Sequence, residues 1–166
     1  MAEAPRKAAV IPYRIRKKRV EVALVTTSGG KRWIVPKGSV DRGEAIREAA
    51  IREAEEEAGL LGVLSRKPLG RYLHVNGDGA CHVDVYVMRV TEELEHWMED
   101  RWRRRRWMPA PDAADLLRKE LRRFVHAVER LADVRRTQSR VADAPIDEPR
   151  QRIETFPNAR YARPGA

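Results

Sequence analysis

The chain has little cysteine and no long apolar run, and each shortage excludes a class of protein. Cys81 is the one cysteine among 166 residues, so no disulfide can form within the chain and no cysteine cluster can bind zinc. We interpret Cys81 as a small buried strand residue. The apolar runs are far shorter than the roughly 18 residues that span a bilayer, and residues 1–20 lack the apolar core of a cleavable signal. We therefore expect a soluble, cytoplasmic protein with no membrane partner.

Acidic residues are outnumbered, which points to an anionic partner. The chain carries 34 basic and 25 acidic side chains, for a formal net charge of +9, and most of the basic residues are arginine. Arginine binds phosphate and carboxylate groups through two parallel hydrogen bonds. The excess lies mainly in residues 101–136, whereas residues 44–57 are acidic. Two opposite fields in one small domain suggest a metal site beside an anion-binding surface.

Alternating β-branched and aliphatic residues predict strands that pair in hairpins. The expected strands cover residues 7–15, 20–27, 32–35, 63–75 as one strand or a pair, 82–90 and 107–108. The first two are joined by the basic turn 16–19, and the turn 76–79 leads into the strand at 82–90. Residues 37–43 follow Pro36 and are expected to form a loop.

Two stretches predict helices. Residues 44–58 contain neither glycine nor proline, and their apolar residues, mostly alanine, recur at helical spacing until Gly59 ends the run. Asp112 or Asp115 is expected to cap a short helix, which an amphipathic helix through Leu131 follows. Strands that alternate with helices indicate an α/β fold, with helices on both faces of a partly antiparallel sheet.

The composition predicts one folded domain and a tail. Hydrophobic residues make up 42% of the chain, enough for a single buried core. We assign residues 1–136 to this domain. Residues 137–166 are polar, contain proline and have no periodicity, so we expect a tail that is loosely docked or disordered. The oligomeric state is left open.

Three glutamates in the acidic segment are the strongest candidates for a metal site. Glu53, Glu56 and Glu57 stand at positions i, i+3 and i+4, so all three project from one face of the expected helix. Like charges this close repel, and carboxylate oxygens are ligands that Mg²⁺ and Mn²⁺ prefer. The alternative is a solvated acidic face, partly neutralised by ion pairs between Arg52 and Glu48.

The glutamates belong to a longer pattern. It reads G-x(5)-E-x(7)-R-E-U-x-E-E-x-G-U, where U is apolar, and its fixed positions are Gly38, Glu44, Arg52, Glu53, Glu56, Glu57 and Gly59. Ala54 and Leu60 stand at the U positions. This segment resembles the signature of the Nudix hydrolases. The resemblance implies a Nudix fold, which is an α-β-α sandwich, and hydrolysis of a diphosphate linked to another group X.

The resemblance also implies a role for each matched residue. Glu56 and Glu57 would bind Mg²⁺ or Mn²⁺, Glu53 would be a further ligand or the general base, and Gly38 would offer its carbonyl. Arg52 would orient the glutamates, Glu44 would hold the loop to the helix, and Gly59 is a structural position. A general base outside the pattern stays open, with the candidates Glu92, Glu93 and His74.

Residues outside the pattern narrow the substrate. Segments 32–36, 85–97 and 103–107 resemble the diphosphoinositol polyphosphate phosphohydrolases, a subgroup that also cleaves diadenosine polyphosphates, whereas Pro36-Lys37-Gly38 resembles the dinucleoside polyphosphate hydrolases. A substrate with many phosphates needs many cations. The expected phosphate-binding residues are Arg6, Lys7, Lys31, Arg32, Lys37, Arg42 and the run from Arg103 to Arg106, which includes Arg105.

Two alternatives concern the basic segment and its tryptophans. Residues 103–106 either bind phosphates or form a solvated basic strand with alternating faces. Trp97, Trp102 and Trp107 either stack on adenine or fill the core or cover an apolar edge. The segment together with the basic C-terminal helix could bind nucleic acid, although no known nucleic-acid motif supports this. An RNA 5′-pyrophosphohydrolase of the decapping type would combine both ideas. We therefore expect a pyrophosphatase whose partner is a polyphosphorylated small molecule.

Overall fold

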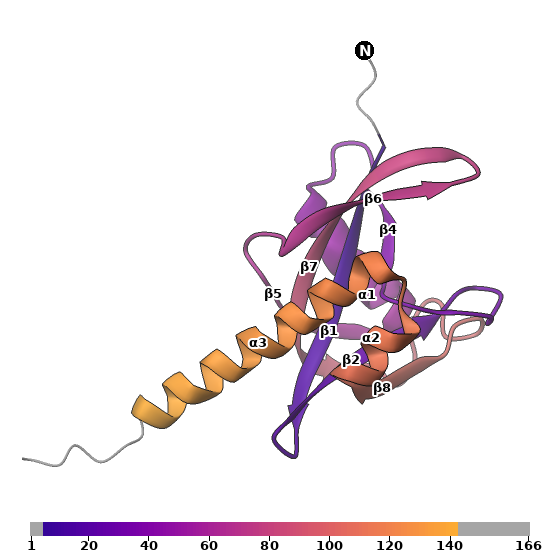
Figure 1. Cartoon of the computed structure of the whole chain (residues 1–166). Helices are drawn as coiled ribbons and strands as arrows, with labels where there is room; N and C mark the ends of the chain where they lie inside the picture. Colours follow the sequence, from indigo (N-terminus) through magenta and orange to yellow (C-terminus); the bar gives the residue numbers. More distant parts are fainter. Residues whose placement is uncertain (1–4, 143–166) are drawn as a thin grey trace, which may run out of the picture.

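The structure is a computed structural model that describes residues 5–142 (Figure 1). Its elements, in chain order, are β1 (Arg6–Arg16), β2 (Arg19–Thr26), β3 (Trp33–Ile34), β4 (Lys37–Ser39), α1 (Ile46–Ala58), β5 (Leu60–Leu64), β6 (Gly70–Asn76), β7 (Gly79–Glu93), β8 (Arg105–Pro109), α2 (Ala110–Leu116) and α3 (Lys119–Ala142). The predicted helix at 44–58 and the predicted strands are all present. The segment 63–75 is resolved into the separate strands β5 and β6.

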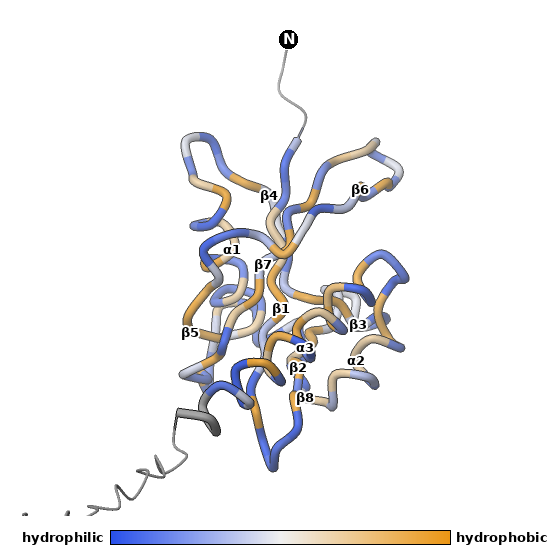
Figure 2. Tube along the Cα trace, turned by 60° about the vertical axis from the view of Figure 1, so that its left-hand side comes forward, coloured by the Kyte–Doolittle hydropathy of each residue, from blue (hydrophilic) through white to orange (hydrophobic). Residues whose placement is uncertain are grey.

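The strands form one mixed sheet of eight strands, with the central order β3-β2-β1-β7-β5. β4 pairs with β1, β6 with β7, and β8 with β2. β1 and β7 run parallel, and the other pairs are antiparallel. The predicted turn between β1 and β2 places Lys17 and Lys18 at positive φ, a geometry that matches the twist of a tight hairpin. It is the strongly hydrophilic loop at the bottom of Figure 2.

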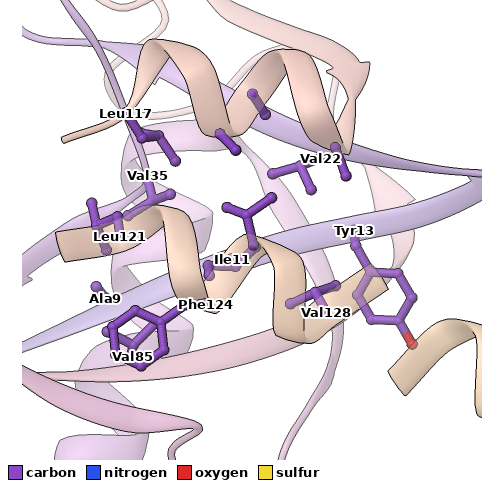
Figure 3. Packing of buried hydrophobic residues seen from close by; sticks show 14 of the residues in the cluster. Ala9, Ile11, Tyr13, Val22, Val35, Val85, Leu117, Leu121, Phe124 and Val128 are labelled. Carbon is purple, nitrogen blue, oxygen red and sulfur yellow. The ribbon is translucent and has the colours of Figure 1, made fainter. Parts of the chain in front are cut away.

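Helices cover both faces of the sheet, as the fold prediction requires. On one face, α1 packs its alanines against β1 and β7, in a cluster that includes Ala8, Val10, Ala50 and Tyr86. On the other face, α2 and α3 cover the larger cluster shown in Figure 3. That cluster includes Ile11, Val22, Val85, Leu117, Leu121, Phe124 and Val128. Cys81 is buried in this second cluster, as predicted.

Several local expectations are corrected. Residues 37–39 form β4 instead of a loop, because their backbone pairs with Lys7–Ala9 of β1. α2 begins directly after Pro109, with Pro111 in its first turn, where a missing N–H costs nothing. Asp112 therefore lies inside the first turn of α2, and neither Asp112 nor Asp115 is the cap.

The C-terminal helix also differs from the expected tail. α3 continues to Ala142, past the predicted domain end at residue 136, because residues 137–142 contain neither glycine nor proline. The rest of the predicted tail, residues 143–166, lies outside the described residues. α3 is amphipathic and highly charged, and none of the helices between residues 5 and 142 could span a bilayer.

Candidate active site

The last turns of α1 carry the three glutamates on one side of the helix. The opposite side is held against the sheet by Ala50, Ala54 and other alanines that are fully buried. Because small side chains let the helix approach the strands closely, the glutamates at its edge are covered as well. Glu53 and Glu57 are only 7% and 5% exposed. The alternative of a solvated acidic face is therefore wrong for these two residues.

Arg52 connects the helix to the loop before it. Its Nε and Nη2 donate to the two carboxylate oxygens of Glu44 at 2.8 and 3.0 Å, and Nη1 donates to Glu53 at 2.8 Å and Glu56 at 3.2 Å. The carbonyl of Ser39 also accepts from Nη2, at 3.0 Å. The hydrogen bonds from Arg52 hold the pKa of Glu44 at about 2. These contacts have the form that the resemblance implies for Arg52 and Glu44.

β4 fits directly against the glutamates. Gly38 has no room for a side chain, because a Cβ there would overlap the carboxylate of Glu53. The backbone N–H of Lys37 donates to Glu57 Oε2 at 3.0 Å. At the other end, Gly59 terminates α1 with φ at 61°, the left-handed region that glycine adopts easily. The glycines of the pattern thus stand where the backbone must approach the helix or turn away from it.

A segment about 40 residues after the glutamates in sequence packs against them in the fold. Residues 97–103 dock on the last turn of α1. Trp97 Nε1 donates to the backbone carbonyl of Glu57 at 3.0 Å, and the N–H of Glu99 donates to the backbone carbonyl of Glu56 at 3.1 Å. Arg103 from this segment pairs with Glu57 at 2.6 Å. Glu99 lies close enough to raise the pKa of Glu53 and Glu57. No spacing rule identifies Glu99, because its neighbours in space are about 40 residues away in sequence.

The acidic cluster holds more negative charge than its surroundings neutralise. We define it as Glu44, Glu53, Glu56, Glu57 and Glu99. These five carboxylates contact two guanidinium groups, of Arg52 and Arg103. Burial raises the pKa of Glu53, and it raises the pKa of Glu57 to about 7. A buried carboxylate whose charge is so poorly compensated fits a divalent cation.

The cluster is not a preformed cage. Within the described part of the chain, no three side chains of His, Cys, Asp or Glu converge on one point as metal ligands do. The guanidinium groups stand among the glutamate oxygens instead. Oxygen donors of this kind suit Mg²⁺ or Mn²⁺, so the chemistry of the donor set fits the group that the resemblance implies.

A basic cavity has Lys37 of β4 in its lining. Its volume is about 570 Å³, and its cationic lining residues are Lys31, Arg32, Lys37 and Arg118, with Trp33, His74 and Leu116 beside them. Burial and the nearby charge of Lys7 lower the pKa of Lys37. Burial and Lys37 likewise lower the pKa of His74. Four of the predicted phosphate-binding residues, Lys7, Lys31, Arg32 and Lys37, are therefore brought together, and Arg118 is one that sequence reasoning missed.

Three more of the predicted phosphate-binding residues are held elsewhere by protein acceptors. Arg6 pairs with Asp84 at 3.0 Å, and Arg103 pairs with Glu57 and Glu99. Arg105 is 11% exposed and donates to the carbonyls of Ala58 and Leu94. The run 103–106 thus has alternating faces, as one alternative expects: Arg103 and Arg105 turn inward, and Arg104 and Arg106 are exposed.

The tryptophans and the candidate bases are also placed. Trp97 lies under the guanidinium of Arg105, at 4.5 Å from its ring centre, and Trp107 lies under Arg14 at 4.1 Å, so neither ring offers both faces to adenine. Trp102 is half exposed. Glu93 pairs with Arg14 and Arg105 at the end of β7, Glu92 is exposed beside it, and His74 lines the basic cavity.

A second cavity, of about 790 Å³, lies along the outer side of α1. Its apolar lining comes from Ile51, Leu94, Trp97 and Met98. Glu44, Glu48, Glu55 and Glu56 stand at its edge together with Arg52. Glu44 and Glu56 thus belong both to this cavity and to the acidic cluster. Glu57 of the cluster contacts the backbone of Lys37, which lines the basic cavity, so the cluster adjoins both cavities.

Comparison with known proteins shows the family. A model of the NUDIX domain matches residues 4–128. "Nudix hydrolase 12, mitochondrial" of Arabidopsis thaliana is 31% identical over 172 residues, which cover 88% of this chain and 85% of that protein. "Diphosphoinositol polyphosphate phosphohydrolase 3-beta" of Bos taurus is 41% identical over 110 residues, which cover 64% of this chain and 65% of that protein.

A solved structure supports the fold. The binary complex of Caenorhabditis elegans Ap4A hydrolase superposes with a TM-score of 0.68 at 20% identity, covering 78% of this chain and 98% of that one. Several curated relatives from Arabidopsis thaliana and Bos taurus are longer than their match, which spans between 60% and 66% of their length. The pattern at 38–60, the α-β-α sandwich and the match over residues 4–128 agree, and this chain belongs to the Nudix family of hydrolases.

Proposed function

We propose that this enzyme hydrolyses a phosphoanhydride bond in a dinucleoside polyphosphate, using Mg²⁺ or Mn²⁺ bound at the acidic cluster. The observation that carries the proposal is the position of Lys37. Its backbone N–H donates to Glu57, while its side chain lines the basic cavity. A phosphate chain in that cavity would therefore lie next to the glutamates, and the reacting phosphorus would lie between cations on both sides.

The chain's own residues account for most of the proposed chemistry. Glu56, Glu57, Glu53 and the carbonyl of Gly38 are the ligands that we assign, with Glu53 as the alternative general base. A divalent ion held there supplies charge neutralisation and activates water as a nucleophile. Arg52 orients Glu53 and Glu56 by hydrogen bonds of 2.8 and 3.2 Å. Such supporting contacts keep carboxylate ligands in place.

The basic cavity favours a substrate with several phosphates. Lys31, Arg32, Lys37 and Arg118 contribute four cationic side chains to one cavity, with Lys7 close by. A single diphosphate bridged by a metal needs fewer cations than this. The rings of Trp33 and His74 line the same cavity and suit a planar group at the end of the phosphate chain.

The second cavity favours a nucleoside over an inositol phosphate as the remaining group. Its apolar residues would accept an uncharged ring. The carboxylates of Glu48 and Glu55 at its edge would repel a group that carries several phosphates. The relative from Bos taurus is named for diphosphoinositol polyphosphates and the C. elegans structure for Ap4A. For this chain, the lining of the two cavities supports the second kind of substrate.

Product analysis on a panel of substrates tests the proposal. The full-length protein is assayed with Mg²⁺ and with Mn²⁺ on dinucleoside polyphosphates, an inositol pyrophosphate, ADP-ribose, a nucleoside triphosphate and 5′-triphosphorylated RNA. We expect kcat/KM to be highest for a dinucleoside polyphosphate. Preference for the inositol pyrophosphate would contradict the choice of nucleoside, and preference for RNA would establish the decapping-type alternative.

A charge variant tests the basic cavity. Arg118→Gln should lower kcat/KM for a diadenosine hexaphosphate by about tenfold, because a charge-assisted hydrogen bond is lost. The loss on ADP-ribose should be smaller. Arg130→Gln, which removes the same charge from an exposed position on α3, is the matched control and should change neither substrate. Equal losses of kcat/KM on both substrates in Arg118→Gln would remove Arg118 from the phosphate site.

Residence of the protein in the cytoplasm stays a prediction.

A further inference from the structure

Arg103 is held from three sides next to the proposed metal ligands. Its side chain is only 12% exposed. Nη2 donates to Glu57 Oε1 at 2.6 Å, Nη1 donates to the backbone carbonyl of Thr26 at 3.0 Å, and Nε pairs with Glu99. A guanidinium group with all its sides in contact has one geometry, so its position relative to Glu57 is fixed by the fold.

Backbone contacts fix Glu99 in the same way. Its N–H donates to the carbonyl of Glu56, and its own carbonyl accepts from the N–H of Arg103 at 2.9 Å. Trp97 Nε1 anchors the segment 97–103 to the carbonyl of Glu57. The guanidinium therefore stands between two carboxylates, one on α1 and one on the docked segment.

We propose that Arg103 is a positioning residue that occupies Glu57 when no metal is bound, and that Glu99 keeps the guanidinium when Glu57 turns to the metal. This inference rests on the proposed function, because it takes Glu57 as a metal ligand. Both oxygens of Glu57 accept in this structure, Oε1 from Arg103 and Oε2 from the Lys37 N–H, whereas Arg52 donates to one oxygen each of Glu53 and Glu56. A divalent cation at Glu57 Oε1 would therefore meet the charge of Arg103 directly and be repelled by it. Glu99 reduces the cost of the exchange, since Arg103 keeps one charged partner and the carbonyl of Thr26.

The proposal fixes the sign of an effect on metal affinity. Without Arg103, Glu57 and Glu99 would face each other without the cation between them, and a divalent ion would meet no competitor at Oε1. Affinity for the metal should therefore rise. A residue that only stabilises the segment 97–103 would have the opposite effect, because its loss would disorder the ligands and lower the affinity.

Direct Mn²⁺ binding to the full chain, followed by the electron paramagnetic resonance signal of free Mn²⁺, tests this. Arg103→Gln should bind Mn²⁺ about fivefold more tightly than the unsubstituted chain. Arg104→Gln removes the same charge from the exposed neighbouring residue and should stay within about twofold. Unchanged or weaker binding by Arg103→Gln would overturn the proposal. If that variant does not fold, Arg103→Lys carries the test, because an ammonium group cannot span three acceptors and should also raise the affinity.

Two further variants separate the possible failures. Glu57→Gln should lose most of the Mn²⁺ affinity, and if it does not, the proposed metal site itself is wrong. Glu99→Gln should weaken binding, because Arg103 then pairs with Glu57 alone, whereas the exposed Glu95→Gln should not. In the Arg103→Gln background, Glu99→Gln should have little effect. An equal loss in both backgrounds would mean that Glu99 acts on the metal without Arg103, which would also overturn the proposal.

Discussion

Two buried carboxylates in this molecule have pKa values that are shifted in opposite directions. Asp84 on β7 is 3% exposed and pairs with Arg71 at 2.6 Å and Arg6 at 3.0 Å. Burial opposes its ionisation, but the hydrogen bonds from the two arginines outweigh burial and keep the pKa of Asp84 below its ordinary value. Glu57 on α1 is buried to a similar degree, yet burial there wins over Arg103 and raises its pKa to about 7.

The difference lies in the ratio of charges. One carboxylate meets two guanidinium groups around Asp84, whereas the five carboxylates of the acidic cluster meet two. The first group has a net positive charge without any ligand, and it suits a structural role. The second group has a deficit of positive charge, and a divalent cation would fill it. Burial alone therefore does not separate a structural carboxylate from a candidate metal ligand, but the balance of charge does.

The largest expected effect comes from removing a charge from the acidic cluster. Glu57→Gln should lower turnover at least about a hundredfold, since a ligand of the metal is lost. Its melting temperature in a chelator should stay the same or rise, because the substitution removes a buried charge that other carboxylates surround. The single oxygen of glutamine keeps one of the two donors, Arg103 or the Lys37 N–H. Turnover with Mg²⁺ and thermal unfolding are the two measurements. Near-normal turnover would refute the role of Glu57 and break the contrast with Asp84.

The same conservative substitution should have different effects in the two regions. Arg52 holds three carboxylates and the carbonyl of Ser39, and lysine cannot reproduce that geometry. Arg52→Lys should therefore reduce kcat about tenfold or more, as expected for a residue that orients metal ligands. Arg71→Lys, beside Asp84, should leave kcat unchanged. Steady-state kinetics of the two variants is the measurement. Equal losses of kcat in Arg52→Lys and Arg71→Lys would contradict the contrast between the acidic cluster and the Asp84 group.

The local part of the site could be predicted from sequence. The spacing of Glu53, Glu56 and Glu57 is a property of any helix, and the alternation around the turn 16–19 defines the first hairpin. The α-β-α layers follow from the order of strands and helices. The helix spacing and the hairpin depend only on residues that are close in sequence, and the layers depend only on the order of the elements.

The remaining part depends on contacts between distant segments. Glu99 and Arg118 reach the site from segments that follow α1 by 40 residues or more, and neither has a spacing that marks it. Arginine is a residue type that binds phosphate, but Arg105 donates to the backbone carbonyls of Ala58 and Leu94 instead. The proline-rich start of α2 has the composition of a break, although proline is well tolerated in a first helical turn.

A smaller effect is expected from Asp84→Asn, and it should be on stability. Arg6 and Arg71 would lose their charged partner, but both side chains are about half exposed and can be hydrated by water. The free energy of unfolding should fall by about 1–2 kcal/mol, while kcat changes little. Urea denaturation in a chelator gives the comparison with Glu57→Gln. A loss in Glu57→Gln that equals the loss in Asp84→Asn would mean that the two carboxylates play the same part.

The last comparison concerns the pH dependence of stability in a chelator, where each step of pH has a small effect. The pKa of Glu57 rises from an ordinary 4.5 to about 7 on folding, so between these values the folded chain binds more protons than the unfolded chain. Its contribution to the free energy of unfolding should therefore fall as pH rises through this window, by at most about 1.4 kcal/mol per pH unit. Asp84 has the opposite sign, because its lowered pKa makes its contribution disappear as pH falls below the ordinary value of 3.8. Urea midpoints of the unsubstituted chain and Glu57→Gln between pH 4.5 and 7 test the first sign, and the difference between the two chains removes the titration of other groups. Parallel profiles would show that Glu57 is charged throughout, and the contrast between the two carboxylates would then rest on geometry alone.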